Sequence, residues 1–293
     1  MRTETSPLKS TGSRLATRAP PQAYFLMSAV FHYLGPAFAV LLFAAVAPLG
    51  VAWLRIATAA LVFALWRRPW RYFARLDAPA QHTVIALGVT LALMNACFYL
   101  AIARLPLGTV SAIEFLGPIG LAAAGMGSPR NFASLALAAA GVYQLTGLRL
   151  AGEPLGFLFA FANCSLFVFY IVLGHRIAAA DGLAGIDRLG IAMLVALLTA
   201  LPIGLRDALP AFSQPLLLAA AAGVGICSSV IPYVCDQFAM AHLPRATFAL
   251  LLALLPALAS LIGALVLRQI PSGPDLAGVA LVIAAVLLHR PAG

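Results

Sequence analysis

The sequence predicts an all-α, polytopic membrane protein with ten transmembrane helices arranged as two inverted five-helix repeats. Three observations lead to this fold class. Of the 293 residues, 63% are hydrophobic and 9% are charged, whereas about 25% of the residues in a typical soluble domain are charged. The apolar residues gather in segments long enough to cross a bilayer, and two stretches of the chain resemble each other. A soluble fold of this size has too little interior to bury so much apolar surface.

Ten apolar segments are the candidate helices. A spanning helix needs about 20 mainly apolar residues. Dividing the chain at its charges, prolines and glycines gives the segments 23–44, 48–66, 82–103, 106–126, 131–148, 154–176, 187–204, 213–241, 244–267 and 274–289. Their apolar runs lack the strict alternation of a membrane β-barrel, so we expect helices, which satisfy their own backbone hydrogen bonds in lipid.

The ends and the basic residues predict the orientation. The polar residues 1–22 lack the apolar core of a signal peptide, so we expect a disordered cytoplasmic tail there. With the N-terminus inside, thirteen basic residues lie in cytoplasmic segments and four at exterior ends, while Arg55 falls within a span. This positive-inside bias, together with the even number of segments, predicts that both termini are cytoplasmic.

An internal repeat divides the chain. LAIARLPLGTVSAIEFLGPIGLAAAG (100–125) aligns without a gap with FAMAHLPRATFALLLALLPALASLIG (238–263), 138 residues later, and both copies carry two prolines twelve residues apart. Five helices are an odd number, so we expect the two halves, 23–149 and 150–293, to have opposite orientations in the membrane. Inverted repeats with proline-interrupted helices at matching positions are typical of secondary transporters, whose binding site lies near the repeat interface.

Four stretches of the sequence carry a family resemblance: GVAWLRIA (50–57), MNACFYLAI…LPLG…EFLGP (94–118), YIVLGHR (170–176) and SSVIPYVCDQFAMAHLPRATF (228–248). Together they make the chain, from about residue 24 to 289, resemble the EamA family of the drug/metabolite transporter superfamily, and most of all its threonine/homoserine exporter branch. The resemblance implies a multi-pass protein of the bacterial inner membrane that works by alternating access.

Glu114 is the only charge between Arg104 and Arg130. A charge in mid-bilayer costs roughly 2.5–3.5 kcal/mol on insertion scales, which favours a functional role. Pro118 lacks an N–H group and so frees the carbonyl of Glu114. The two acceptors together suit an ammonium group or a proton. Alternatively, the acid pairs with a neighbouring Arg or Tyr and holds helices together. The repeat partner of Glu114 is Leu252, so only one half carries this acid.

Asp236 is the acid of the second half. Pro232 frees the carbonyl of Ser228, and Tyr233 lies one turn before Asp236 on the same face. The exporters that the chain resembles carry an acid at this place, which implies a site residue. Alternatively, Asp236 pairs with Arg245 or extends toward the interface. The expected helix-break positions are Pro118, Pro232 and Pro256.

Other polar side chains are expected to line a cavity. Asn95 and Tyr99 lie one turn apart on one face, as do Asn163 and Tyr170 two turns apart. Asn95 and Tyr99 align with Tyr233 and Gln237 in the repeat, which favours a cavity lined from both halves. The alternative is that these groups only join helices by hydrogen bonds.

Arg55 lies within the segment 48–66 and matches an Arg of the family. A substrate carboxylate suits the planar guanidinium, but the side chain could also extend outward or bond backbone carbonyls. Related exporters often have an acid before the proline of segment 244–267, where this chain has Leu255. On that resemblance, Glu114 would be the main protonatable group of the membrane core.

Several function classes lack their motifs. The sequence contains no GxxxxGK[ST] loop for ATP and no HExxH motif or nucleophile elbow. The cysteines lie in apolar segments without metal-ligand spacing: Cys97, Cys164, Cys227 and Cys235. We therefore expect no enzyme, no cofactor and no metal. The net charge of +9 is assigned to membrane orientation and not to nucleic acid.

The leading hypothesis is a secondary transporter that exports small amino acids, threonine- or homoserine-like, or related metabolites against a proton gradient. Its partners would be a small-molecule substrate, protons and the lipid bilayer, and it would act as a monomer or homodimer. Two alternatives are export of another small solute, such as a drug-like cation, a purine or a sugar derivative, and a membrane scaffold or intramembrane enzyme. The inverted repeat argues against the last alternative.

Overall fold

The computed structural model describes residues 20–124, 129–146, 153–178, 183–243, 248, 252 and 254–288. These residues form helices and connecting loops, and no β-strand occurs among them. The elements are α2 (Pro21–Leu42), α3 (Pro48–Arg67), α4 (Trp70–Phe73), α5 (Ala78–Ile102), α6 (Leu107–Ala124), α7 (Pro129–Thr146), α8 (Pro154–Ala178), α9 (Leu183–Phe212), α10 (Pro215–Gly225), the π-helix η2 (Ile226–Val230), α11 (Ile231–His242), α13 (Leu254–Leu267) and α14 (Gly273–Leu288). The predicted all-α class is confirmed for these residues. The predicted tail 1–22 lies outside them up to residue 19.

Within the described part of the chain, six stretches of helix are long and apolar enough to cross a membrane: Ala23–Leu42, Pro48–Arg67, Ala78–Ile102, Pro154–Ala178, Ala184–Phe212 and Pro215–His242. The predicted spans 106–126, 244–267 and 274–289 correspond to shorter apolar helices, and 131–148 corresponds to the more polar α7. Large side chains such as Leu65, Leu216 and Leu265 are exposed on the outer faces. Exposed apolar side chains of this kind suit a surface that faces lipid rather than water.

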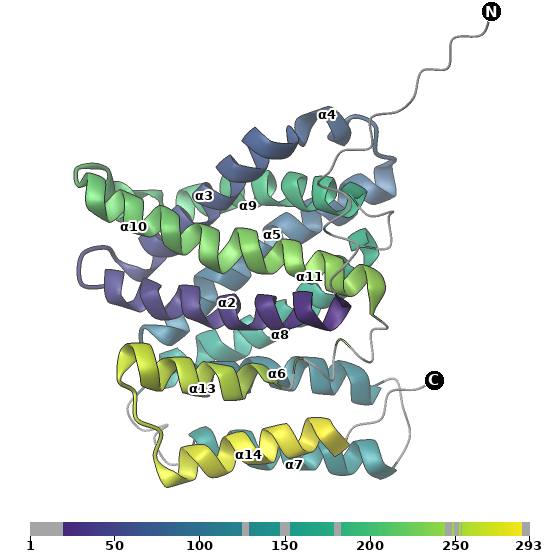
Figure 1. Cartoon of the computed structure of the whole chain (residues 1–293), viewed down its shortest axis with the longest axis vertical. Coiled ribbons are helices and arrows are strands. Elements are labelled where there is room, and N and C mark those ends of the chain that lie inside the picture. The colour runs from purple at the N-terminus through teal and green to yellow at the C-terminus, as the bar shows by residue number, and fades with distance from the viewer. Residues whose placement is uncertain are drawn as a thin grey trace, which may run out of the picture.

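The helices lie side by side in a stack (Figure 1). At one end α3 packs on α9 and α10, and at the other end α14 packs on α7. Between them, α2 packs on α11 and α13, whereas α8 packs on α5 and α6. The middle of the stack therefore joins helices from both halves of the chain, and the acids predicted for the site lie there.

Prolines set many helix starts. Pro21, Pro48, Pro129, Pro154 and Pro215 are each the first residue of a helix. Proline suits this position because its missing N–H has no partner in the first turn anyway and its φ is already helical. This explains why cutting the sequence at prolines predicted most helix starts to within a few residues.

One predicted helix differs from the structure. Segment 244–267 was predicted as one span with a helix break at Pro256, whereas Leu252 already lies in a turn and the described part of α13 runs from Leu254 to Leu267. Pro256 is therefore in the first turn, where proline is tolerated. Its repeat partner, Pro118, lies inside the continuous helix α6 instead. The same proline thus has different surroundings in the two halves.

Helices α3 and α9 approach each other through glycines. A Cβ added at Gly204 would lie 2.4 Å from the carbonyl oxygen of Leu49, and one added at Gly50 would lie 2.4 Å from that of Asp207. Small residues allow such close backbone approach between membrane helices. Nearer the other end of the pair, Arg67 forms a two-pronged salt bridge with Asp187, with Nε–Oδ1 at 2.7 Å and Nη2–Oδ2 at 3.0 Å.

We expect the substitution Gly204→Ala to destabilise the protein, because the new methyl group would push α3 away from α9. Overpacking of this kind typically costs about 1–3 kcal/mol. Gly223→Ala is the matched control, since a Cβ there would meet nothing within 4 Å and alanine favours a helix by about 1 kcal/mol. Thermal unfolding of the purified proteins in detergent measures both. An unfolding temperature for Gly204→Ala at or above that of the wild type would contradict the close packing.

Candidate functional site

Glu114 lies on α6 in the middle of the stack and is only 3% exposed. Its carboxylate accepts hydrogen bonds from the Tyr33 hydroxyl of α2, at 3.0 Å, and from Asn163 Nδ2 of α8, at 2.9 Å. The structure thus brings Glu114 and Asn163 together, as a shared cavity requires. Tyr33 also fits the alternative prediction, in which Glu114 pairs with a neighbouring Tyr and holds helices together.

Arg55 is buried on α3, where it is 3% exposed. Its Nε donates to Ser229 Oγ at 2.7 Å, and its Nη2 donates to the carbonyl of Ser228. The guanidinium also lies over the rings of Tyr99 and Tyr233, at 5.6 and 5.9 Å from their centroids. No carboxylate of the described residues lies within ion-pair distance of it. Of the roles predicted for Arg55, the structure shows the bond to a backbone carbonyl.

The carbonyl that Arg55 binds is available for a local reason. Pro232 has no N–H, so the helix cannot offer its usual donor to Ser228, four residues earlier. The chain widens into the π-helix η2 just before Pro232. α2 comes close at Gly35, where an added Cβ would lie 2.2 Å from Ser228 Cβ. Pro232 therefore creates an acceptor in the protein interior, and Arg55 uses it.

Asn95 and Tyr233 meet across the repeat. Asn95 Nδ2 donates to the carbonyl of Leu91 at 2.7 Å and approaches the Tyr233 hydroxyl at 3.4 Å. Tyr99 contributes its ring to Arg55, whereas its hydroxyl is buried without a hydrogen-bond partner. Tyr99 lines neither of the cavities described next, so its place is beside the site and not in it.

A small cavity in the middle of the stack, the Glu114 cavity, joins most of these groups. It is lined by His32, Arg55, Met94, Asn95, Phe98, Glu114, Asn163 and Tyr233. Both a buried cation, Arg55, and a buried acid, Glu114, face this space. Asn163 Oδ1 is buried without a hydrogen-bond partner. The cavity has about 10 Å³ of free space, roughly the room of one water molecule. A cation, an acid and an unpartnered amide oxygen surround this small space.

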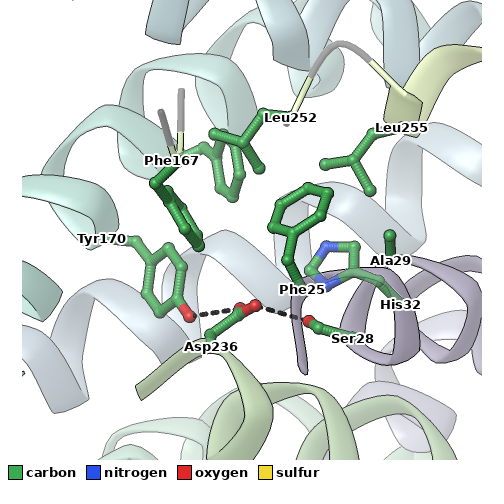
Figure 2. A pocket seen from close by; sticks show the side chains of 10 residues that line it. Phe25, Ser28, Ala29, His32, Phe167, Tyr170, Asp236, Leu252 and Leu255 are labelled. Atoms are coloured by element: carbon green, nitrogen blue, oxygen red, sulfur yellow. Dashed lines mark hydrogen bonds between the residues drawn. The ribbon is translucent and has the colours of Figure 1, made fainter. Parts of the chain in front are cut away.

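Asp236 lies in a second cavity, the Asp236 cavity, shown in Figure 2. It is lined by Phe25, Ser28, Ala29, His32, Phe167, Tyr170, Asp236, Phe248, Leu252 and Leu255. Figure 2 shows Asp236 between Ser28 of α2 and Tyr170 of α8, whose hydroxyls donate to it at 2.5 and 2.9 Å. The structure thus brings the predicted residues Asp236 and Tyr170 together. Arg245, the alternative partner, lies outside the described residues.

The sequence did not predict the groups that α2 supplies. Ser28 and Tyr33 donate to the two acids, and His32 lines both cavities. The sequence contains a pattern that could have identified them, because these three polar side chains fall within one six-residue stretch, 28–33, of an apolar segment. The partners were not predictable in the same way, because Tyr33 and Glu114 are 81 residues apart and Ser28 and Asp236 are 208 apart.

Comparison with known proteins gives a consistent result. Residues 154–289 match the EamA-like transporter family. The chain is similar to the threonine/homoserine exporter RhtA of Escherichia coli (strain K12), with 31% identity over 257 residues, which cover 86% of this chain and 84% of that protein. RhtA of Salmonella typhimurium (strain SL1344) is 30% identical with the same coverage. A solved crystal structure at 21% identity has a similar fold, with a TM-score of 0.57 over 91% of this chain and 96% of the other.

We expect Tyr33→Phe to lower the stability of the protein, because Glu114 would lose one of its two donors. A hydrogen bond to a charged group is worth about 1.5–3 kcal/mol. Tyr99→Phe is the matched control, since it removes a buried hydroxyl that has no partner. A thiol-reactive dye that reports exposure of the buried Cys164 and Cys235 on heating measures both. Equal unfolding temperatures for the two variants would contradict the role assigned to Tyr33.

Proposed function

The chain belongs to the EamA-like transporter family, and on that basis we propose that it is a secondary transporter for small zwitterionic amino acids. We propose threonine- or homoserine-like amino acids as the substrates, the bacterial inner membrane as the location, and protons as the coupling ion. The RhtA relatives are exporters of threonine and homoserine by name, which supports the direction of transport and the substrate class.

The observation that carries the proposal is that Arg55 and Glu114 face the same small cavity. An α-amino acid presents an ammonium and a carboxylate a few ångströms apart. Glu114 suits the ammonium, and the planar guanidinium of Arg55 suits the carboxylate. The two side chains are not paired with each other within 4 Å, so each is available to a ligand.

The neutral groups of the Glu114 cavity favour a hydroxylated side chain. Asn163 Oδ1 is a buried acceptor without a partner, and leaving such a group unmatched costs free energy. A substrate hydroxyl that donates to it would remove that cost. Threonine and homoserine both carry such a hydroxyl, whereas alanine and valine do not. We therefore expect hydroxylated amino acids to be preferred over apolar ones of similar size.

We further propose that the chain is built as two inverted five-helix halves, 23–149 and 150–293, with both termini in the cytoplasm. Two features of the packing support this. The repeat pairs α2 with α8, α5 with α11, and α6 with α13. The packing of α5 on α8 therefore corresponds to that of α11 on α2, and the packing of α6 on α8 corresponds to that of α13 on α2. All four contacts are present. Along α2 the donor to Asp236 comes before the donor to Glu114, whereas along α8 the order is reversed. The two helices therefore pass the acids in opposite directions.

This arrangement suits alternating access. The Glu114 cavity is lined by side chains of α2, α3, α5, α6, α8 and α11, so it lies between the halves. A rocking motion of one half against the other would expose it first to the cytoplasm and then to the exterior. Arg55 of α3 and Glu114 of α6 both belong to the first half, so we expect them to hold the substrate together through the exchange.

Counterflow in proteoliposomes tests the substrate. Wild-type protein loaded with unlabelled homoserine should take up labelled threonine. The amino alcohol that lacks the carboxylate and the hydroxy acid that lacks the ammonium should fail to compete. Glu114→Gln should weaken substrate affinity about 10- to 100-fold, which corresponds to the loss of one hydrogen bond to a charged group. Arg55→Lys should weaken it as well, because lysine cannot present the planar fork.

Asp275→Asn serves as the control, since Asp275 caps the start of α14 through Ser272 and lies outside both cavities. Its counterflow should match that of the wild type. Competition by the amino alcohol as strong as that by threonine would contradict binding of a zwitterion. Uptake of a drug-like cation or a purine in place of amino acids would favour the other class of exporter.

A further inference from the structure

The two cavities are related by the internal repeat. The 138-residue offset continues without a gap into the first helices of the two halves, and it carries four residues of one cavity onto four of the other. The pairs are His32 with Tyr170, Phe98 with Asp236, Glu114 with Leu252, and Phe25 with Asn163. The repeat therefore relates the Asp236 cavity to the Glu114 cavity, and each is lined by residues of both halves.

The acid has a different place in each counterpart. In the Glu114 cavity the carboxylate is on α6. The residue of this cavity that the repeat aligns with Asp236 is Phe98 of α5. In the Asp236 cavity the carboxylate is on α11. The residue of this cavity that the repeat aligns with Glu114 is Leu252. Each cavity thus contains one carboxylate, and the two are supplied by non-equivalent helices.

The two cavities also share structure. His32 lines both of them. Each acid accepts one hydrogen bond from α2 and one from α8. The two donors on α2, Ser28 and Tyr33, are five residues apart, which corresponds to about 7.5 Å along a helix. A movement of α2 relative to α8 would therefore alter the surroundings of both acids at once.

The two cavities differ in what they can bind. The Glu114 cavity contains Arg55 and two asparagines as well as the acid, and so offers groups for both ends of a zwitterion. The Asp236 cavity contains Asp236, three hydrogen-bonding side chains and otherwise only apolar ones. Among the described residues, no Lys or Arg side chain lines it that could receive a carboxylate. The Asp236 cavity can therefore hold a proton, but it is not complementary to an amino acid.

We propose that Asp236 is the proton-carrying station of this transporter, separate from the Glu114 cavity that holds the substrate. This rests on the proposed function. One proton binds the Asp236 carboxylate from the exterior after the substrate has left, and the same proton is released to the cytoplasm when the next substrate binds. The hydroxyls of Ser28 and Tyr170 stabilise the charged form between these steps, because they donate to it.

Among the described residues, which do not include Arg245, few other polar or titratable groups lie near Asp236. α2 presents Ser28 and His32, and α8 presents Tyr170. His175 of α8 lies behind Phe248, in ring contact at 5.7 Å. On the acid's own helix the neighbours are Tyr233 and Cys235. The side chains Leu252 and Leu255 close the cavity and cannot titrate. Arg55 of α3 is held by Ser228 and Ser229, so the proton would be exchanged at Asp236 itself.

Two assays on the same proteoliposomes separate the stations. The first is counterflow of labelled threonine at equal pH on both sides. The second is accumulation of labelled threonine driven by an imposed pH gradient. Glu114→Gln should reduce both by tenfold or more. Asp236→Asn should abolish the response to the gradient, so that accumulation falls to the level seen without one, while counterflow falls less than about fivefold. Asp275→Asn is the control and should behave as the wild type in both assays.

Each remaining outcome has a defined meaning. If wild-type protein shows no counterflow with any amino acid, the proposed function fails. Suppose instead that the wild-type protein shows counterflow. The proposal of a separate proton station is then wrong if Asp236→Asn still responds to the pH gradient, or if it loses counterflow as fully as Glu114→Gln. Should Asp236→Asn not fold, as judged by size-exclusion chromatography, Ser28→Ala replaces it. That variant should shift the pH of half-maximal accumulation, and an unchanged pH profile would overturn the proposal.

Discussion

Two buried carboxylates, each held by one neutral donor from α2 and one from α8, organise the centre of this protein. Glu114 binds Tyr33 and Asn163, and Asp236 binds Ser28 and Tyr170. An isolated charge is expensive away from water, so these donors are a condition for having acids there at all. They also determine which faces of α2 and α8 turn toward the middle of the stack. The remaining helices pack around that arrangement.

The buried cation is stabilised by a different device. Arg55 is not paired with an acid within ion-pair distance; it binds the Ser228 carbonyl and the Ser229 hydroxyl instead. That carbonyl is free because Pro232 has no N–H to offer it, and the π-helix η2 places it next to α3. A proline in one half thus makes possible a charge in the other. A proline can therefore help to stabilise a buried charge without contributing a side chain to it.

Hydropathy predicted much of the fold because the bilayer leaves the backbone few choices, and proline positions predicted many helix starts. Glu114 was predicted from the cost of a charge in an apolar helix, and Asp236 from the family resemblance. Asn95 and Tyr170 were predicted from polar residues that share one face of a helix. The sequence did not show which of these residues would pair, and it missed the donors Ser28 and Tyr33, because the contacts join helices far apart in the sequence. The contrast between Pro118, inside α6, and Pro256, in the first turn of α13, was also hidden, since the two sites look equivalent in the alignment.

The separation of Arg55 from Glu114 bears on how a transporter can both bind and release its substrate. If the proposed function holds, a direct salt bridge between them would have to be broken by every incoming amino acid, and breaking a buried ion pair is costly. Neutral donors avoid this, because a substrate ammonium can join the Glu114 carboxylate while Tyr33 and Asn163 stay bound to its remaining lone pairs. The guanidinium similarly has more donors than its backbone and hydroxyl partners occupy. Hydrogen bonds to neutral groups thus stabilise both charges within the fold, while neither charge neutralises the other.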